Sequence, residues 1–155
     1  MKPKKRRRLY DRIVAQLPGT VDDFVTPEKH FRGRDLRRLT SAPGQLFHGD
    51  TAVEFSQAVA QECHAVSAYA WLCNPGWRYV YGFAALDSCC ENEWHCHSFC
   101  LDEAGTVIEP TPLGREQYWG VVLDAETTKA VVEEELDNIR RLGFEVTEAH
   151  LALLR

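Results

Sequence analysis

Apolar residues in the first part of the chain recur every three or four positions, which is the period of an amphipathic helix. This spacing predicts a helix over residues 9–17, ended by Pro18-Gly19, and a helical turn over residues 34–39. A further helix is expected from Thr51 onward, where four small or apolar residues fit one face: Ala52, Phe55, Val59 and Ala60. Residues 19–50 are otherwise polar and rich in glycine and proline, which predicts loops.

From Cys63 the pattern becomes apolar on every side, which predicts a buried helix that ends at Asn74-Pro75-Gly76. Aromatic and β-branched residues then dominate, and they predict strands over residues 77–84, 94–101, 106–109 and 118–123. The tetrapeptide Asp102-Glu103-Ala104-Gly105 predicts a hairpin turn between the second and the third of these strands. Residues 86–93 and 110–117 are expected to form loops.

The chain closes with a helical pattern over residues 127–142, which Gly143 ends, and with a final strand or short helix over residues 144–154. Helices come first and antiparallel strands follow, an order typical of the α+β class. A chain of 155 residues is short enough for one domain. We therefore expect a basic N-terminal segment over residues 1–18 and a single domain over residues 19–155, with its core over about 51–123.

Charge is distributed unevenly along the chain, although the formal net charge is only −5. Residues 1–38 hold twelve Lys and Arg against five Asp and Glu, whereas the remaining residues carry a net negative charge. An acidic body argues against general nucleic-acid binding across its surface, so the basic run Lys2–Arg8 is the candidate for polyanion contact. The alternative is that this run is a solvated terminus or the charged start of a helix.

No apolar run is long enough to cross a membrane, and no apolar segment follows the basic N-terminus. We therefore expect neither a membrane span nor a secretory signal. Six cysteines without an export signal indicate free thiols in a reducing, cytoplasmic setting. The adjacent residues Cys89 and Cys90 also have a poor geometry for pairing with each other.

Cys63 stands where the buried helix is expected to begin, which makes it a candidate nucleophile. A helix N-terminus and a nearby imidazolium both favour the thiolate form of a cysteine, which is the reactive form. The alternative is that Cys63 is a small core residue, as free cysteines often are.

His95 and His97 are candidates for the base, because strand alternation places both on one face together with Phe99. We expect that face to be the one turned toward the helix. A hairpin at residues 102–105 further predicts Glu109 roughly opposite His97, since each lies about six residues from the turn. A carboxylate there fixes the tautomer of His97 and stabilises its imidazolium. His64, directly beside the thiol, stays an alternative base.

Gln57 precedes Cys63 by six residues, and its side-chain amide is a candidate donor to an oxyanion, together with the backbone N–H of Cys63. Gln61 is a competing candidate. The alternative for Gln57 is a surface glutamine on a helix.

Sulfur and imidazole groups crowd residues 89–100, and this composition suggests a structural zinc as an alternative chemistry. The groups concerned are Cys89, Cys90, His95, Cys96 and Cys100. However, no C-x₂-C pair occurs, and alternation places Cys96 and His97 on opposite faces of a strand. We therefore expect core or loop thiols here, with no metal and no cofactor.

The residues from Gln57 to Leu123 resemble the papain-like, or transglutaminase-like, cysteine enzymes, in particular small bacterial and phage members. Papain-like enzymes also place a glutamine six residues before their cysteine. In those small members the segments H-A-W, V-I-D-P-T and Y-x-G follow one another, with an acidic-Gly turn after the first. The matching segments here are His97-Ser98-Phe99, Val107-Ile108-Glu109-Pro110-Thr111 and Tyr118-Trp119-Gly120.

Three positions depart from that pattern. Glu109 stands for aspartate, Phe99 for tryptophan, and His64 for the aromatic residue that follows the cysteine. The longer side chain of Glu109 carries its carboxylate one methylene further from the backbone.

The resemblance implies a papain-like core in which Cys63 is the nucleophile, His97 the base and Glu109 the third member, with Gln57 as oxyanion donor. It implies a thiol hydrolase that acts through a thioester on a peptide, isopeptide or glutamine-type amide, as a protease or deamidase does. Its substrate would be a protein or peptide. One alternative is a non-enzymatic module that binds nucleic acid or protein and holds a structural zinc at residues 89–100. Another is an inactive thiol-enzyme fold that serves as an inhibitor or scaffold.

Overall fold

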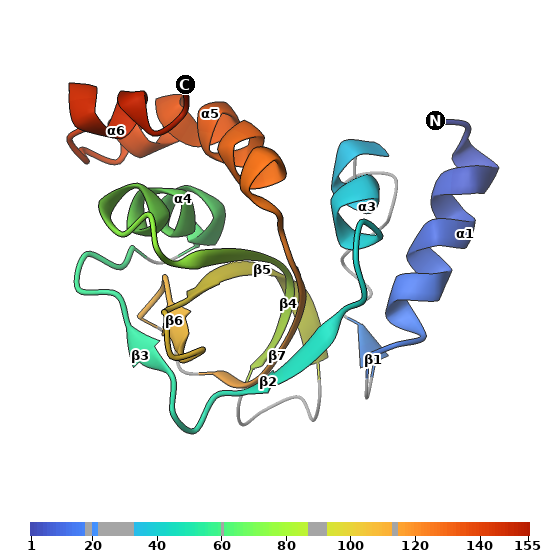
Figure 1. Cartoon of the computed structure of the whole chain (residues 1–155). Helices are drawn as coiled ribbons and strands as arrows, with labels where there is room; N and C mark the ends of the chain where they lie inside the picture. Colours follow the sequence, from blue (N-terminus) through green and yellow to red (C-terminus); the bar gives the residue numbers. More distant parts are fainter. Residues whose placement is uncertain (18–19, 22–32, 60, 87–92, 113–114) are drawn as a thin grey trace.

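The computed structural model describes residues 1–17, 20–21, 33–59, 61–86, 93–112 and 115–155 of the chain. These residues form a mixed α+β fold in which one curled sheet carries helices on its outer face (Figure 1). The expected α+β class is confirmed. None of the helices within these ranges is long and apolar enough to cross a membrane.

Seven strands of the described residues form the sheet. They are β1 (Thr20–Val21), β2 (Gln45–His48), β3 (Val53–Glu54), β4 (Arg78–Leu86), β5 (Glu93–Leu101), β6 (Val107–Glu109) and β7 (Arg115–Val122). Their order is β2-β7-β4-β5-β6-β3, and β1 pairs with β5 beside this path. The pairs β1–β5 and β3–β6 are parallel, and the others are antiparallel.

Helices cover the outer face of the curl. They are α1 (Pro3–Val14), α3 (Gly33–Leu39), α4 (Cys63–Cys73), α5 (Ala125–Arg141) and α6 (Glu148–Ala152). The helix α4 packs across β4 and β5, and α5 packs against α4 from the other side (Figure 1). The helix α3 contacts β4 and β7, and α1 packs beside α3.

Alternation along the strands divides the core into an outer and an inner part. The outer core fills the space between helices and sheet and includes Tyr81 and Phe83 of β4. The inner core lies within the curl and consists of Val80, Ala84, Phe99, Leu101, Val107 and Tyr118. Position along a strand therefore decides which core a side chain faces, and His97 shares the inner face with Phe99.

Three strands lie level with one another at Gly82. Gly82 of β4 pairs with His97 of β5 on one side and with Gly120 of β7 on the other. A Cβ atom at Gly82 would collide with the carbonyl oxygen of Trp119 and with the Cα atom of Gly120. The missing side chain at Gly82 therefore lets the backbones of β4 and β7 approach each other at the level of His97.

Most of the predicted elements are present, with shifted ends. The first helix begins at Pro3 rather than at residue 9, because proline is favoured in the first helical turn. The basic run Lys2–Arg8 is therefore the start of this helix, whose Tyr10 and Ile13 are buried in the outer core. The last predicted strand begins at Arg115 rather than at Tyr118, and the final segment contains the short helix α6. Most of the loop expected over residues 86–93 lies outside the described residues.

The helix expected from Thr51 is wrong. Residues 53–54 form β3, which pairs in parallel with β6, and residues 56–57 form a turn. Phe55 donates its backbone N–H to the carbonyl oxygen of Glu109 at 2.8 Å, so strand pairing continues past β3. Four apolar residues in a short run fit the period of a helix and also that of a strand. Pairing with β6 decides in favour of the strand here. Ala60, part of the same expected face, lies outside the described residues.

Substitution of Gly82 by alanine tests the close approach of β4 and β7. We expect Gly82→Ala to lower the free energy of unfolding by about 1–3 kcal/mol, because the new methyl group meets backbone atoms that cannot rotate away. Denaturant titration followed by circular dichroism measures this change. Gly33→Ala is the matched control, since a Cβ atom there meets nothing closer than 3.4 Å. Equal stability of both variants would contradict the role given to Gly82.

Candidate active site

Hydrogen bonds fix the beginning of α4 on β5. Nδ1 of His64 lies 2.6 Å from Oγ of Ser98, and Ser67 donates its hydroxyl to the carbonyl oxygen of Ser98 at 3.0 Å. His64 follows Cys63 in α4, and Ser98 follows His97 in β5. This contact therefore brings the start of the helix, where Cys63 lies, to the part of the strand that carries His97.

Cys63 lies beside a hydrogen-bonded pair formed by His97 and Glu109. Cys63 and His97 line the same cavity, and Cys63 raises the pKa of His97. Nε2 of His97 lies 2.9 Å from Oε1 of Glu109, which leaves Nδ1 as the ring nitrogen for the thiol. His97 is 1% exposed and Glu109 is 4% exposed, whereas Cys63 is only partly buried. Cys63 is thus partly accessible, whereas His97 and Glu109 are enclosed.

The carboxylate of Glu109 accepts three more hydrogen bonds. Thr111 donates its backbone N–H and its hydroxyl to Oε1 at 3.0 and 2.8 Å, and the hydroxyl of Tyr118 donates to Oε2 at 2.6 Å. Burial alone raises the pKa of Glu109, but His97 and then these donors outweigh it and hold the pKa below its ordinary value. The group is therefore a carboxylate at neutral pH.

His97 is positively charged at neutral pH. Burial alone lowers the pKa of His97, but the hydrogen bonds and negative charges of Cys63 and then Glu109 outweigh burial and raise it to about 9. The site therefore brings a potential nucleophile, Cys63, together with a proton donor, His97.

Two details of the expected geometry are wrong. The face of β5 that packs against the body of α4 carries Ser98 and Cys100, not His97, because the inner face is turned into the curl. The pairing Cys100↔Ile108 places Phe99, not His97, opposite Glu109 when it is continued by one residue. Glu109 reaches His97 diagonally across the strand pair, and its long side chain makes this contact possible.

A cavity opens at the edge of the sheet beside the thiol. The strand β1 pairs with β5 only at residues 93–94, and β6 pairs with it only at residues 100–101. Between these pairings lies a cavity of about 280 Å³, lined by Gln61, Cys63, His95, Cys96, His97, Thr111 and Arg115. A substrate carbonyl group that enters this cavity would meet both the sulfur and the imidazole.

The two alternative bases have other contacts. His95 also lines the cavity, but its Nε2 accepts a hydrogen bond from Nε of Arg115 at 3.2 Å. Burial, and then the positive charges of His97 and Arg38, lowers the pKa of His64 to about 4. His64 is therefore neutral at neutral pH and cannot balance the charge of a thiolate.

The cavity contains Gln61 rather than Gln57. Gln57 lies exposed in the turn after β3 and is not among the residues that line the cavity. Gln61, the competing candidate, has φ of 66°, an uncommon backbone conformation for a residue other than glycine. This bend, two residues before Cys63, brings Gln61 to the cavity. No hydrophobic pattern in the sequence predicts such a bend. The only sequence signal for Gln61 is its closeness to the cysteine.

The N-terminus of α4 provides backbone donors near the cavity. Glu62, the N-cap residue, makes no side-chain cap hydrogen bond to the helix. Its carboxylate instead accepts a hydrogen bond from Arg141 of α5 at 3.2 Å. The N–H groups of the first helical turn have no partner within a helix, and they are suited to stabilise negative charge.

Metal binding finds no support among the residues that the structure describes. Within those residues no group of three or more His, Cys, Asp or Glu side chains is placed to hold a metal ion. Cys63, Cys73, Cys96 and Cys100 are free thiols. Cys89 and Cys90, which belong to the suggested zinc cluster, lie outside the described residues.

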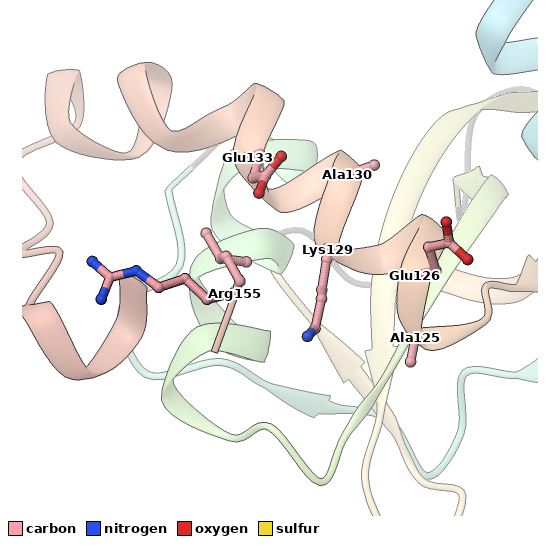
Figure 2. Close-up of a pocket in the computed structure, with 7 residues that line it drawn as sticks. Ala125, Glu126, Lys129, Ala130, Glu133 and Arg155 are labelled. Carbon is pink, nitrogen blue, oxygen red and sulfur yellow. The ribbon is translucent and has the colours of Figure 1, made fainter. Parts of the chain in front are cut away.

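A larger hollow lies at the other end of α5 from Glu62. It has a volume of about 540 Å³ and is lined by Ala125, Glu126, Lys129, Ala130, Glu133, Leu154 and Arg155 (Figure 2). Figure 2 shows charged side chains of both signs around it. None of the candidate site residues lines this hollow, and it contains no nucleophile or base of the kind described above.

Comparisons of the chain with models of protein families, with curated proteins and with solved structures found no match. The function therefore has to be inferred from the arrangement of the side chains themselves.

Replacement of Glu109 by glutamine tests the charge that holds the proton on His97. We expect Glu109→Gln to lower the pKa of His97 from about 9 toward 6.5, because burial lowers this pKa and, of the two groups that raise it, only Cys63 would remain. A group whose pKa is raised by folding stabilises the folded state at low pH. The unmodified protein should thus lose this stability as pH rises from 6.5 through about 9, and the variant should not.

NMR titration of the imidazole and unfolding at several pH values measure the two effects. Glu54→Gln is the control, because Glu54 is exposed and lines a neighbouring cavity together with Glu109. An unchanged titration of His97 in the Glu109 variant would refute the assignment.

Proposed function

We propose that this chain is a thiol hydrolase with a papain-like core, in which Cys63 is the nucleophile, His97 the acid and base, and Glu109 the group that orients His97. One observation carries the proposal. A buried, hydrogen-bonded His97–Glu109 pair lies beside a partly buried cysteine, Cys63, which lines the same cavity as His97 and raises its pKa. If the His97–Glu109 pair served only to stabilise the fold, it would not need a cysteine beside the imidazole.

The reaction that fits these groups is acyl transfer through a thioester. The sulfur of Cys63 attacks the carbonyl carbon of an amide, and the C–N bond breaks as His97 gives its proton to the leaving amine. A water molecule then attacks the thioester while His97 takes a proton from it. The carboxylic acid leaves, and the thiolate and the imidazolium are restored.

When the sulfur attacks, negative charge develops on the oxygen of the substrate carbonyl, and this charge needs hydrogen-bond donors at the N-terminus of α4. In this proposal the backbone N–H of Cys63 and the side-chain amide of Gln61 provide them. Gln61 takes the role expected of Gln57, because Gln61 lines the cavity and Gln57 does not.

The proposed substrate is a protein or peptide with a peptide, isopeptide or glutamine-type amide bond. Hydrolysis is proposed over transfer to a second amine. A second part of the proposal is polyanion contact through the first turns of α1, where Lys4, Lys5, Arg7 and Arg8 are exposed. The four free thiols among the described residues favour a reducing compartment such as the cytoplasm.

Selective alkylation tests the nucleophile. At a low concentration of an iodoacetamide probe, we expect labelling at one residue, Cys63, because its neighbours favour the thiolate. Cys63→Ser should abolish this labelling, which is read by mass spectrometry. Cys73→Ser and Cys96→Ser should keep it, although Cys73 is the exposed thiol. Equal labelling of all six cysteines would count against an activated thiol.

A pair of histidine substitutions tests the base. We expect His97→Asn to slow alkylation of Cys63 near neutral pH by about tenfold or more, because the positive charge beside the sulfur is lost. His95→Asn, from the same strand and cavity, should change the rate little. Stopped reactions analysed by mass spectrometry give the rates, and circular dichroism checks that both variants fold. The opposite order of the two rates would assign the base to His95.

A further inference from the structure

The cavity beside Cys63 contains a second thiol. Cys96 lines it as Cys63 does, and both are free and partly buried. Cys96 belongs to β5 and Cys63 to α4, so the two residues line the cavity from different elements. Burial, and then the nearness of Cys63, raises the pKa of Cys96.

Cys96 has an imidazole of its own. Nε2 of His64 lies 3.8 Å from Sγ of Cys96, a distance at which a thiol can donate to the ring. Nδ1 of the same ring contacts Oγ of Ser98 at 2.6 Å, which is satisfied when Nδ1 carries the proton of the neutral ring. Nε2 is then an acceptor that points at Cys96. The stacking of His64 on Tyr81, with ring centroids 5.2 Å apart, holds the ring in this position.

Adjacency in sequence links the two thiol–imidazole pairs. His64 is the residue after Cys63, and Cys96 is the residue before His97. The contact between His64 and Cys96 therefore fixes the separation of α4 and β5 where both thiols lie. The proposed hydrolysis uses the pair Cys63–His97 and leaves the pair Cys96–His64 without a role.

We propose that Cys96 is the resolving cysteine for Cys63, so that oxidation of this site by a peroxide ends in a disulfide between Cys63 and Cys96. The inference rests on the proposed function in that it needs a reactive Cys63. In the first step the thiolate of Cys63 attacks one oxygen of hydrogen peroxide, the O–O bond breaks, and with one proton the products are a sulfenic acid and water.

In the second step the sulfur of Cys96 attacks the sulfur of that sulfenic acid. As the S–S bond forms, the thiol proton passes by way of His64 to the leaving hydroxide, the S–O bond breaks, and water is released. The two cysteines have then lost two electrons to the peroxide. A dithiol reductant returns both thiols. The disulfide thus protects Cys63 from further oxidation to the sulfinic acid, which reductants do not reverse.

Peroxide treatment of the whole chain tests this inference. After treatment and digestion without reductant, we expect peptides joined through Cys63 and Cys96, and recovery of iodoacetamide labelling at Cys63 after dithiothreitol. In Cys96→Ser the sulfenic acid of Cys63 should persist, so that labelling by dimedone rises several-fold. Excess peroxide should then convert that Cys63 to the sulfinic acid, with no recovery. Cys73→Ser is the matched control and should behave as the unmodified chain.

His64→Asn tests the proton acceptor, and it should slow formation of the disulfide while Cys63 still forms the sulfenic acid. Thermal unfolding checks that this variant is folded. Oxidised Cys63 joined to Cys73, Cys89 or Cys90, or left unpaired in the unmodified chain, would overturn the inference. Such results would leave the proposed function intact, because Cys63 would still be reactive. Absence of both dimedone and iodoacetamide selectivity at Cys63 would instead sink the proposed function.

Discussion

A carboxylate buried within the curl of the sheet is the group on which the rest of this structure depends. Glu109 is 4% exposed, and a charge so enclosed is tolerated only when it is paired and fully hydrogen-bonded. Thr111 and Tyr118 supply neutral donors, and His97 supplies the positive charge. After Cys63, the same carboxylate raises the pKa of His97, the group that lies beside Cys63. The His97–Glu109 interaction therefore contributes both to the stability of the inner core and to the proposed chemistry of Cys63.

Polar contacts determine how the buried helix sits on the sheet. The helix α4 is apolar on nearly all sides, so hydrophobic packing alone leaves its position along β5 poorly defined. Its two polar residues on that side, His64 and Ser67, both bind Ser98, one through the side chain and one through the carbonyl oxygen. These bonds select one alignment of helix and strand. The sulfur of Cys63 owes its place to that alignment.

Local pattern predicted the elements well and their mutual placement less well. The helix from Cys63, the hairpin at residues 102–105 and the helix α5 agree with the sequence, since each has a strong period and a turn or a cap. Alternation correctly grouped His97 with Phe99, but it cannot tell which face of a curled sheet is turned inward. The helix expected from Thr51 is wrong, because pairing with β6 makes residues 53–54 a strand, and this contact joins segments that are distant in the sequence. The sequence favours Gln57 over Gln61 as the oxyanion donor, because Gln61 reaches the cavity through a bend in the backbone and not through a recognisable spacing.

The diagonal reach of Glu109 has a consequence for how such a sheet can vary. Phe99 is the residue across from Glu109, so the imidazole of His97 lies two positions further along the neighbouring strand. A chain that carried its acid two positions later along the same register would set the carboxylate directly across from the histidine, and there the shorter aspartate would suffice. The position of the acid along the chain and the length of its side chain are thus coupled: a change in one requires a matching change in the other.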